Sequence, residues 1–296
     1  MSTALQAQGS FIALVTPFDN QGRIDWKCVE KLIAWHIKQG TDALVCFGST
    51  GEVMSLSEFE KKKLIAVAVE IANNQIPIIA NTGTADTRQT VRSTGQMMKL
   101  GAAGCLAVPP YYNKPTQQGC ILHFSEIAKV GLPVIIYNNP GRTSTNLEAE
   151  TVAKISEIPG IFGYKDATGN LHLMRKIQKL SSIPIFLGDD HLTYAALLEG
   201  AKGGISVVGN LFPKEWKKMI SLSLQGNWEA SKKIADRFLP LCQSLSLEPN
   251  PQCIKFAMSY LELCGPTLRL PLIPPTDQTQ HQIKQVINVT LQSEKA

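Results

Sequence analysis

The sequence predicts an α/β protein, a (β/α)8 TIM barrel with an added C-terminal helical segment. Eight short apolar runs, rich in β-branched residues, alternate with amphipathic stretches. Their repeat of about 28 residues fits one strand, one helix and two loops. The runs are almost continuously hydrophobic, as parallel strands covered on both faces are. The rival is an open doubly wound sheet, but no G-x-G-x-x-G motif follows the first run. Eight strand–helix units therefore favour a closed barrel.

The predicted elements divide the chain into two regions. Strands are expected over residues 11–18, 43–48, 76–83, 104–112, 132–140, 161–168, 183–190 and 203–210. Helices are expected between them, and the one over 57–72 begins with a capping box formed by Ser57 and Glu60. After residue 212 the strand pattern stops, and helices are expected over 213–225, 227–247, 251–264 and 277–292. We therefore assign residues 1–224 to a barrel that carries the active site, and residues 225–296 to a C-terminal helical domain.

The composition is that of an ordinary globular protein and argues against several functions. Of 296 residues, 44% are hydrophobic and 18% are charged, which disfavours intrinsic disorder. The apolar runs are far shorter than the roughly 18 residues of a membrane span, so no membrane association is expected. The net charge of +5 is mild and no basic block is interleaved with aromatic residues, so no nucleic-acid binding is expected. A mild positive field suits a small anionic substrate.

The cysteines and the N-terminal residues indicate a reducing compartment. Seven cysteines, an odd number, are scattered through apolar stretches without a C-x-x-C pair. They are expected to be reduced, buried thiols rather than disulfides or a zinc site. The first ten residues show neither the basic nor the apolar region of a signal peptide, so a cytoplasmic location is expected.

Lys165 is the most informative residue at the carboxyl ends of the predicted strands, where barrels place their active sites. It lies inside an apolar strand, and the two-residue period puts it on one face with Ile161 and Gly163. Phe162 and Tyr164 are expected on the other face. Gly163 is expected to leave room beneath a lysine that points into the barrel. Burial disfavours the ammonium form, and a neutral amine attacks a carbonyl to form a Schiff base.

Hydroxyl groups and one arginine surround the lysine at the same end of the predicted barrel. Tyr137 ends the neighbouring strand, and a phenol beside an amine transfers protons. Ser49, Thr50 and Tyr112 offer further hydroxyls for a proton relay. Glycines on either side of Ser49 and Thr50 let the backbone amides approach a carboxylate. Arg142 suits bidentate binding of a second carboxylate.

Each of these residues also has an ordinary structural explanation. Lys165 then forms an ion pair with Asp166 or another carboxylate. Tyr137 caps the core with its hydroxyl in water, and Arg142 is a solvated loop arginine. Position in the sequence alone leaves these alternatives open.

The segment Asp189–His191 carries metal-ligating residue types, but it is predicted to be the acidic start of a helix. No cysteine or histidine stands at ligand spacing from another, so no catalytic metal is expected. The acidity of the segment also argues against the phosphate site that many barrels form after their last two strands.

Five motifs together resemble the dihydrodipicolinate synthase family. They are G-S-T-G-E (48–52), P-P-Y-Y-N-K-P (109–115), Y-N-N-P-G-R-T (137–143), G-Y-K-D-A-T-G (163–169) and G-D-D (188–190). The motifs stand in the family's order at the spacing of barrel strands, and the resemblance extends from T-P-F (16–18) to the C-terminal helices. The family belongs with N-acetylneuraminate lyase to a superfamily of pyruvate-dependent class I aldolases.

The resemblance implies a catalytic role for four residues. Lys165 corresponds to the lysine that forms the Schiff base with pyruvate, and Tyr137 to the general acid/base. Ser49 and Tyr112 correspond to hydroxyls of a proton relay. In this family the tyrosine at the position of Tyr112 reaches in from the neighbouring subunit of a tight dimer, and the usual assembly is a homotetramer made of two such dimers.

The resemblance also implies the substrates. Pyruvate condenses with L-aspartate 4-semialdehyde on the route to diaminopimelate and lysine, and no cofactor takes part. Thr50 corresponds to the residue that holds the pyruvate carboxylate, and Ile205 to a backbone contact with pyruvate. Arg142 corresponds to the arginine that receives the carboxylate of the aldehyde.

The sequence departs from the family's pattern at three positions near the site. Ser49 stands where threonine is commoner and keeps the hydroxyl. Asn139 stands where a small apolar residue is commoner and is expected to alter the rim of the pocket. Asp166 is one methylene shorter than the usual glutamate.

A further departure concerns the site where lysine inhibits some members of the family. Glu58 and Lys61 stand in place of two histidines, and Ala85 and Gln89 in place of an asparagine and a glutamate. The changes remove partners for the ammonium groups of lysine, and Lys61 adds a like charge. Inhibition by lysine is therefore expected to be weak or absent.

Three other functions remain as alternatives. A sibling aldolase, such as N-acetylneuraminate lyase or a 2-keto-3-deoxy sugar-acid aldolase, shares Lys165 and Tyr137, but the lyases lack the arginine at position 142. A phosphosugar-binding barrel without Schiff-base chemistry needs a phosphate nest, which the acidic G-D-D segment opposes. A barrel that serves only as a scaffold does not need the complete set of site side chains that is present here.

Overall fold

The computed structural model describes residues 4–292 and confirms the closed barrel. Eight parallel strands follow one another in sequence order, and β8 pairs with β1 to close the sheet. They are β1 (Gly9–Ala13), β2 (Ala43–Cys46), β3 (Ile78–Asn81), β4 (Gly104–Ala107), β5 (Val134–Asn138), β6 (Ile161–Asp166), β7 (Ile185–Leu187) and β8 (Gly203–Ser206). Residues 1–3 and 293–296 lie outside the described residues. The first three belong to the N-terminal segment of the predicted barrel region, and the last four to the end of the predicted C-terminal helical domain.

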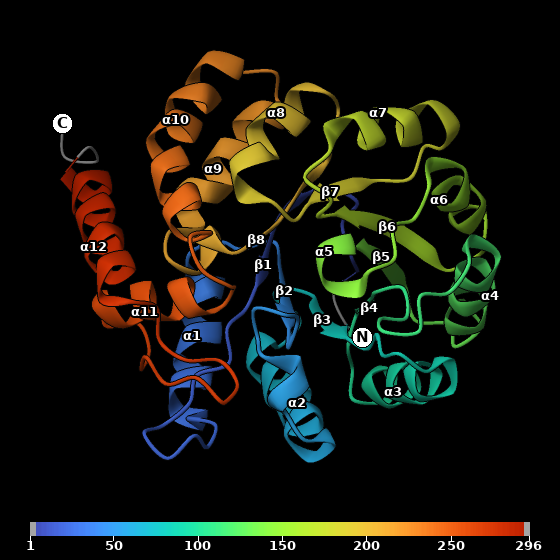
Figure 1. The fold of residues 1–296 in the computed structure, drawn as a ribbon, viewed down its shortest axis with the longest axis horizontal. Helices are drawn as coiled ribbons and strands as arrows, with labels where there is room; N and C mark the ends of the chain where they lie inside the picture. Colours follow the sequence, from blue (N-terminus) through green and yellow to red (C-terminus); the bar gives the residue numbers. More distant parts are fainter. Residues whose placement is uncertain (1–3, 293–296) are drawn as a thin grey trace.

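Helices surround the barrel on its outside (Figure 1). Between the strands lie α1 (Trp26–Lys38), α2 (Glu58–Ala72), α3 (Thr87–Lys99), α4 (Gln117–Ala128), α5 (Pro140–Thr143), α6 (Ala149–Ser156), α7 (Leu171–Leu180) and α8 (Thr193–Leu198). After β8 come α9 (Pro213–Leu224), α10 (Trp228–Ser244), α11 (Gln252–Tyr260) and α12 (Asp277–Gln292). Short 3-10 helices are η1 (Val53–Ser55), η2 (Asp190–Leu192) and η3 (Val208–Asn210). The predicted capping box is present, since Ser57 and Glu60 exchange hydrogen bonds at the start of α2.

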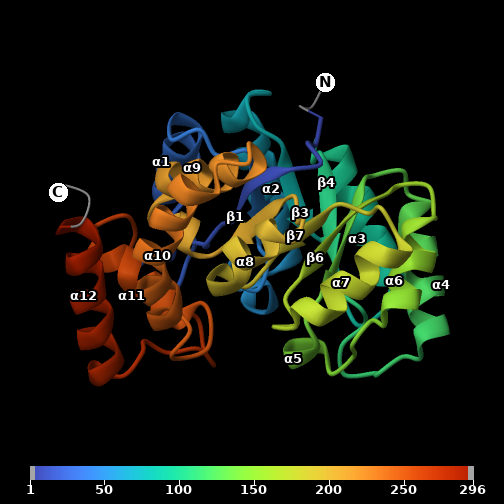
Figure 2. The same cartoon turned by 90° about the horizontal axis from the view of Figure 1, so that it is seen from above.

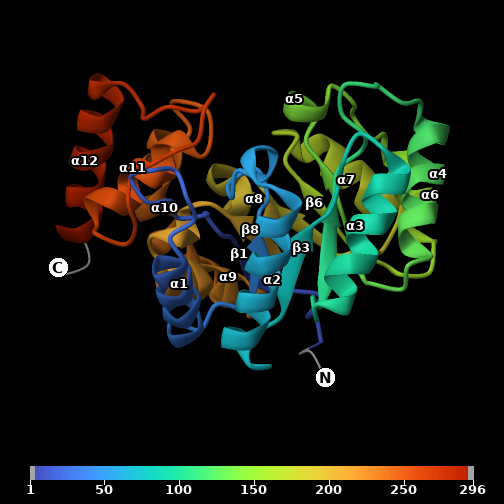
Figure 3. The same ribbon diagram turned by 90° about the horizontal axis from the view of Figure 1, so that it is seen from below.

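The strands are shorter than the predicted runs, because each run continues into the loop that follows its strand. β4, for example, ends at Ala107, whereas the predicted strand extended to residue 112. The polar ends of the runs therefore lie in loops at the carboxyl end of the barrel. Figure 3 shows α5, which directly follows β5, at the end of the barrel opposite the N-terminus.

The predicted faces of β6 are correct for its second half and wrong for its first half. Gly163 and Lys165 pair with Ile135 and Tyr137, which belong to the apolar cluster inside the barrel. Phe162 also packs against this interior cluster, although it was expected on the outer face. The reason is a shift of register between β5 and β6 just before Ile135, which leaves Phe162 as an extra residue. Such a bulge interrupts the two-residue alternation.

The interior of the barrel is a packed core rather than a channel. Its cluster runs from Phe11 of β1 to Ile205 of β8, and the rings of Phe11 and Phe186 stack with their centroids 4.7 Å apart. Layers of side chains fill (β/α)8 barrels in this way. Polar chemistry is therefore restricted to the end of the barrel, above the apolar layers.

The helices α9 to α12 lie along one side of the barrel (Figures 1 and 2). One apolar cluster joins them to it, with Leu32 of α1, Trp216 of α9, Phe238 of α10, Ile254 of α11 and Ile283 of α12 among its buried members. The division of the chain into two domains at residue 224 stays a prediction. The structure adds that both regions contribute to this one cluster.

No helix within residues 4–292 is long and apolar enough to cross a membrane. All seven cysteines are unpaired, and all are buried except Cys28, which is half-buried. The cysteines therefore agree with the expected set of reduced thiols that pack as small apolar side chains.

Candidate active site

A pocket of about 450 Å³ opens at the carboxyl end of the barrel. The structure brings five of the seven predicted site residues to its lining, namely Ser49, Thr50, Tyr137, Arg142 and Lys165. They come from the ends of β2, β5 and β6 or from the segments that follow these strands. The parallel barrel accounts for this gathering, because all of its strands end on the same side.

Lys165 lies beside Tyr137 and is only 5% exposed. The two residues are partners in the β5–β6 ladder, and Nζ of Lys165 lies 4.3 Å from the centroid of the Tyr137 ring. Asp166 points to the other side of the strand, where its Oδ1 accepts hydrogen bonds from the N–H and the hydroxyl of Thr168 at 2.9 and 2.7 Å. The geometry thus favours the amine-and-phenol pair over an ion pair between Lys165 and Asp166.

Gly188, just after β7, makes the room for the Lys165 side chain. A Cβ atom at Gly188 would lie 2.7 Å from Cε of Lys165 and 2.9 Å from Cβ of Ala167. A Cβ atom at Gly163 would instead lie 3.3 Å from the ring of Phe186. The expectation that Gly163 provides this room is therefore wrong. Inside a barrel the nearest neighbour of a side chain stands on the adjacent strand, here β7, which the sequence spacing along β6 does not reveal.

The hydroxyl of Tyr137 is held by hydrogen-bond donors. Nδ2 of Asn139 donates to it at 2.9 Å, and Ser49 also forms a hydrogen bond with it. Burial raises the pKa of Tyr137, but the charge of Lys165 lowers it. The hydrogen bonds from Asn139 and Ser49 and the charge of Arg142 lower it further, so that the pKa of Tyr137 lies below its ordinary value. A phenol of lowered pKa exchanges its proton more readily, as general acid/base catalysis requires.

The segment between α10 and α11 closes one side of the pocket, which the sequence did not reveal. Asn250 donates from Nδ2 to Oγ1 of Thr50 at 2.9 Å, and its carbonyl oxygen accepts from Nη2 of Arg142 at 2.9 Å. Cys242 and Glu248 line the pocket as well. In the sequence, residues 249–251 indicate only a proline-rich break between helices. The one available signal was the polar Asn250 between two prolines.

Asp189 and Asp190 form an acidic wall of the pocket. Oδ2 of Asp190 accepts from the backbone N–H groups of Val207 and Val208 at 2.9 and 2.7 Å, so this carboxyl group fixes the segment after β8. Burial raises the pKa of Asp190 to about 6, although these hydrogen bonds act in the opposite direction. The predicted acidic start of a helix is present as η2. Within residues 4–292 no group of three or more His, Cys, Asp or Glu side chains is arranged to hold a metal ion.

Tyr112 and Ile205 do not line the pocket of the single chain. Tyr112 is 92% exposed and has a left-handed backbone, with φ of 69°, on the loop after β4. Ile205 is fully buried in the barrel interior, where it pairs with Phe11 of β1. Its side chain is therefore turned away from the pocket, and only its backbone is left for the contact that the resemblance implies.

An amine kept out of water next to a phenol, at the open end of a parallel barrel, defines an α/β-barrel enzyme equipped for chemistry on carbonyl groups. Comparison with known proteins identifies the family. The chain belongs to the Dihydrodipicolinate synthetase family, whose model matches residues 6–290.

Individual relatives agree with this assignment. The 4-hydroxy-tetrahydrodipicolinate synthase of Stutzerimonas stutzeri is 40% identical over 285 residues, which cover 95% of this chain and 98% of the relative. The chloride-inhibited dihydrodipicolinate synthase of Acinetobacter baumannii, solved with pyruvate, is 38% identical with a TM-score of 0.94, and the match covers 96% of this chain and 99% of that chain. The enzyme of Cyanidioschyzon merolae, solved with lysine bound, is 36% identical with a TM-score of 0.92, over 96% and 99% of the two chains.

These matches confirm the resemblance, the barrel fold and an enzyme of the lyase class in lysine and diaminopimelate biosynthesis. They favour the synthase over a sibling aldolase, since the curated relatives carry the synthase name. The phosphosugar-binding and scaffold alternatives find no support in them.

We expect Gly188→Ala to lower kcat on the order of 100-fold, because the added methyl group displaces the stem of Lys165. Gly163→Ala is the matched control, since its methyl group meets the edge of Phe186 rather than the lysine. Steady-state kinetics of both purified variants, with circular dichroism to verify the fold, check this expectation. Equal activity of the two variants would show that Gly188 does not set the position of Lys165.

We expect Asn139→Val to raise the pKa of Tyr137, because the variant lacks a donor that stabilises the phenolate. The basic limb of the plot of kcat against pH then moves to higher pH. Asn146→Ala is the control, because Oδ1 of Asn146 bonds to Asn138 and not to the phenol. A basic limb at the same pH in Asn139→Val and in the unmodified enzyme contradicts a role of Asn139 in tuning Tyr137.

Proposed function

We propose that this protein condenses pyruvate with L-aspartate 4-semialdehyde through a Schiff base on Lys165, and that it does so in the cytoplasm. The observation that carries the proposal is the burial of Lys165 with Nζ 4.3 Å from the Tyr137 ring centroid. The same pocket offers Thr50 and Arg142 for two substrate carboxylates. A pocket of about 450 Å³ has space for both small substrates at once.

In the first half-reaction pyruvate binds with its carboxylate against Thr50. The neutral amine of Lys165 attacks the ketone carbon, and Tyr137 transfers a proton to the ketone oxygen to give a carbinolamine. A further proton allows this oxygen to leave as water, and the C=N bond of the Schiff base forms. Tyr137 then removes a proton from the methyl group, which yields an enamine. Ser49 and Tyr112 relay these protons to solvent.

In the second half-reaction the enamine carbon attacks the aldehyde carbon of L-aspartate 4-semialdehyde, whose carboxylate is bound by Arg142. The aldehyde oxygen takes up a proton and becomes the hydroxyl group of the product. The amine of the substrate then attacks the imine carbon and displaces Lys165, which closes the ring of 4-hydroxy-tetrahydrodipicolinate. No step changes the net oxidation state, so the proposal needs no cofactor.

We further propose that the protein is a homotetramer built from two tight dimers. Tyr112 supports the dimer, since it is 92% exposed and lies apart from the pocket of its own chain. Met54 is 75% exposed, and Tyr111 donates from its hydroxyl to Sδ of Met54 at 3.7 Å. Tyr111, which is partly exposed, thus lies against an exposed methionine, and exposed aromatic and apolar side chains of this kind are typical of a protein interface.

Borohydride trapping tests the central step. We expect reduction in the presence of pyruvate to attach a pyruvate-derived group to Lys165, found by mass spectrometry of the digested protein. Lys165→Arg must abolish the adduct, while Lys154→Arg, on the exposed side of α6, must retain it. A folded, unmodified protein that shows no adduct on Lys165 would exclude the mechanism.

A mixing experiment tests whether Tyr112 crosses the dimer. We expect Tyr112→Phe and Lys165→Ala to be nearly inactive alone and to regain about a quarter of normal activity after joint unfolding and refolding, because half of the sites in a mixed dimer are intact. The control is Tyr112→Phe refolded alone. Activity of the mixture no higher than the mean of the separate variants would show that each chain uses its own Tyr112.

We expect lysine to inhibit this enzyme weakly or not at all. Nζ of Lys61 pairs with Oε1 of Glu58 at 2.9 Å, and Ala85 and Gln89 carry no charge. Titration of the purified enzyme with lysine checks this, and the double variant Ala85→Asn/Gln89→Glu is expected to gain sensitivity. Sub-millimolar inhibition of the unmodified enzyme would contradict the prediction.

A further inference from the structure

Glu52 anchors the turn that carries Ser49 and Thr50. Glu52 has a left-handed backbone, with φ of 56°, a conformation that residues other than glycine rarely adopt. The residue is 4% exposed and does not line the pocket. A glycine at this position would avoid the strain. The carboxylate of Glu52 must therefore make contacts that compensate for it.

The partner of Glu52 is a lysine that is completely buried. Nζ of Lys255, on α11, lies 2.5 Å from Oε1 of Glu52 and donates to the carbonyl oxygen of Thr267 at 2.7 Å. It also lies 4.0 Å from the ring centroid of Phe18. Burial lowers the pKa of Lys255, whereas the carboxylate of Glu52 raises it. An ion pair without access to water has a well-defined geometry, because neither charge has an alternative partner in solvent.

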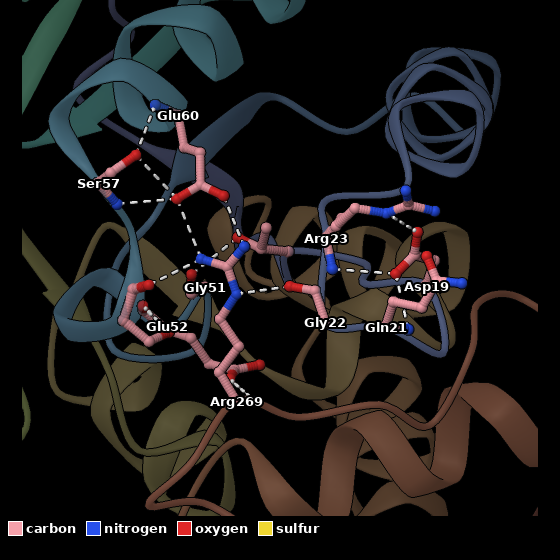
Figure 4. A network of polar contacts seen from close by, with 11 residues as sticks. Asp19, Gln21, Gly22, Arg23, Gly51, Glu52, Ser57, Glu60 and Arg269 are labelled. Carbon is pink, nitrogen blue, oxygen red and sulfur yellow. Dashed lines mark hydrogen bonds and ion pairs between the residues drawn. The ribbon is translucent and has the colours of Figure 1, made fainter.

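Arg269 also contacts Glu52, but its guanidinium group binds mainly to other residues (Figure 4). Its backbone N–H donates to Oε2 of Glu52 at 3.0 Å. Its guanidinium group binds Glu60 of α2 at 2.5 and 3.0 Å and also the carbonyl oxygens of Ser55 and Gly22. The Arg269 side chain therefore fixes the start of α2, whereas Lys255 acts directly on the carboxylate of the turn.

The C-terminal segment thus holds the turn at two points. Lys255 binds Glu52 at its end, and Asn250 binds the hydroxyl of Thr50 two residues earlier. From the other side, the hydroxyl of Thr16 donates to the carbonyl oxygen of Gly51 at 2.7 Å. A change in the backbone of Glu52 rotates the peptide groups before it, and so moves Thr50 relative to Lys165.

We propose that Lys255 is a positioning residue for the pyruvate site, which it controls through its ion pair with Glu52. The inference rests on the proposed function, in which Thr50 holds the pyruvate carboxylate. Loss of the pair lets the turn relax from its strained conformation and weakens the binding of pyruvate. The aldehyde site at Arg142 is joined to this turn only indirectly, through Asn250, and is affected less.

The double variant Glu52→Gln/Lys255→Met tests the proposal, because it removes both buried charges and leaves none unpaired. We expect its KM for pyruvate to rise about tenfold and its KM for the aldehyde to stay within about twofold. The rate of borohydride trapping at low pyruvate concentration should fall in parallel. An unchanged KM for pyruvate in the folded double variant would overturn the proposal.

Arg269→Met is the matched control, since it breaks the ion pair with Glu60 but keeps the backbone N–H that binds Glu52. It should lower the melting temperature and leave the KM for pyruvate within about twofold. An equal rise of this KM in Arg269→Met would assign the effect to general stability and overturn the role of Lys255.

Glu52→Gln alone is the second variant, for the case that the double variant does not fold. Lys255 can then release its proton, because its pKa is already lowered by burial, and the same rise in KM for pyruvate is expected. An unchanged KM in this folded variant counts against the proposal. Unmodified enzyme that fails to trap pyruvate would overturn the proposed function itself, and the positioning role with it.

Discussion

The contact between Lys165 and Tyr137 across the β5–β6 ladder organises the pocket. An amine that attacks a carbonyl has to lose its proton, and a carboxylate in contact with it would hold that proton in place. Asp166 faces the opposite side of β6, so the strand itself separates the neighbouring carboxylate from the amine. Gly188 gives the lysine stem its space from the adjacent strand. The positive charge of Lys165 lowers the pKa of Tyr137 through the same contact, which prepares the phenol as the proton carrier.

Much of this arrangement follows from sequence patterns that are local. Continuous apolar runs and their repeat predict eight strands, and parallel closure then brings Ser49, Tyr137 and Lys165 to one end without any further information. The capping box at Ser57 is equally local. These features need only the period of a strand or helix, which neighbouring residues determine.

The predictions that were wrong or missing concern residues that lie close together in the fold but far apart in the sequence. The bulge that turns Phe162 inward depends on the register between β5 and β6 and leaves the hydrophobic pattern unchanged. Gly188 and Gly163 cannot be distinguished without knowing which strand stands beside Lys165. Asn250 is 200 residues away from Thr50, to which it donates a hydrogen bond. Tyr112 lies away from the pocket of its own chain, and its assignment to the site stays a prediction.

The turn between β2 and α2 shows why the C-terminal helices matter for a barrel enzyme. Phe47 and Glu52, at the two ends of this turn, both have left-handed backbones. This conformation costs about 1–2 kcal/mol of conformational free energy for each residue. Such strain persists only where surrounding contacts hold it in place. At Glu52 those contacts come from Lys255 and Arg269, and Asn250 holds Thr50 two residues earlier; all three of these partners lie beyond the last strand. The barrel strands therefore supply the reactive groups, but the shape of the site around Thr50 depends on residues that follow the barrel in the chain.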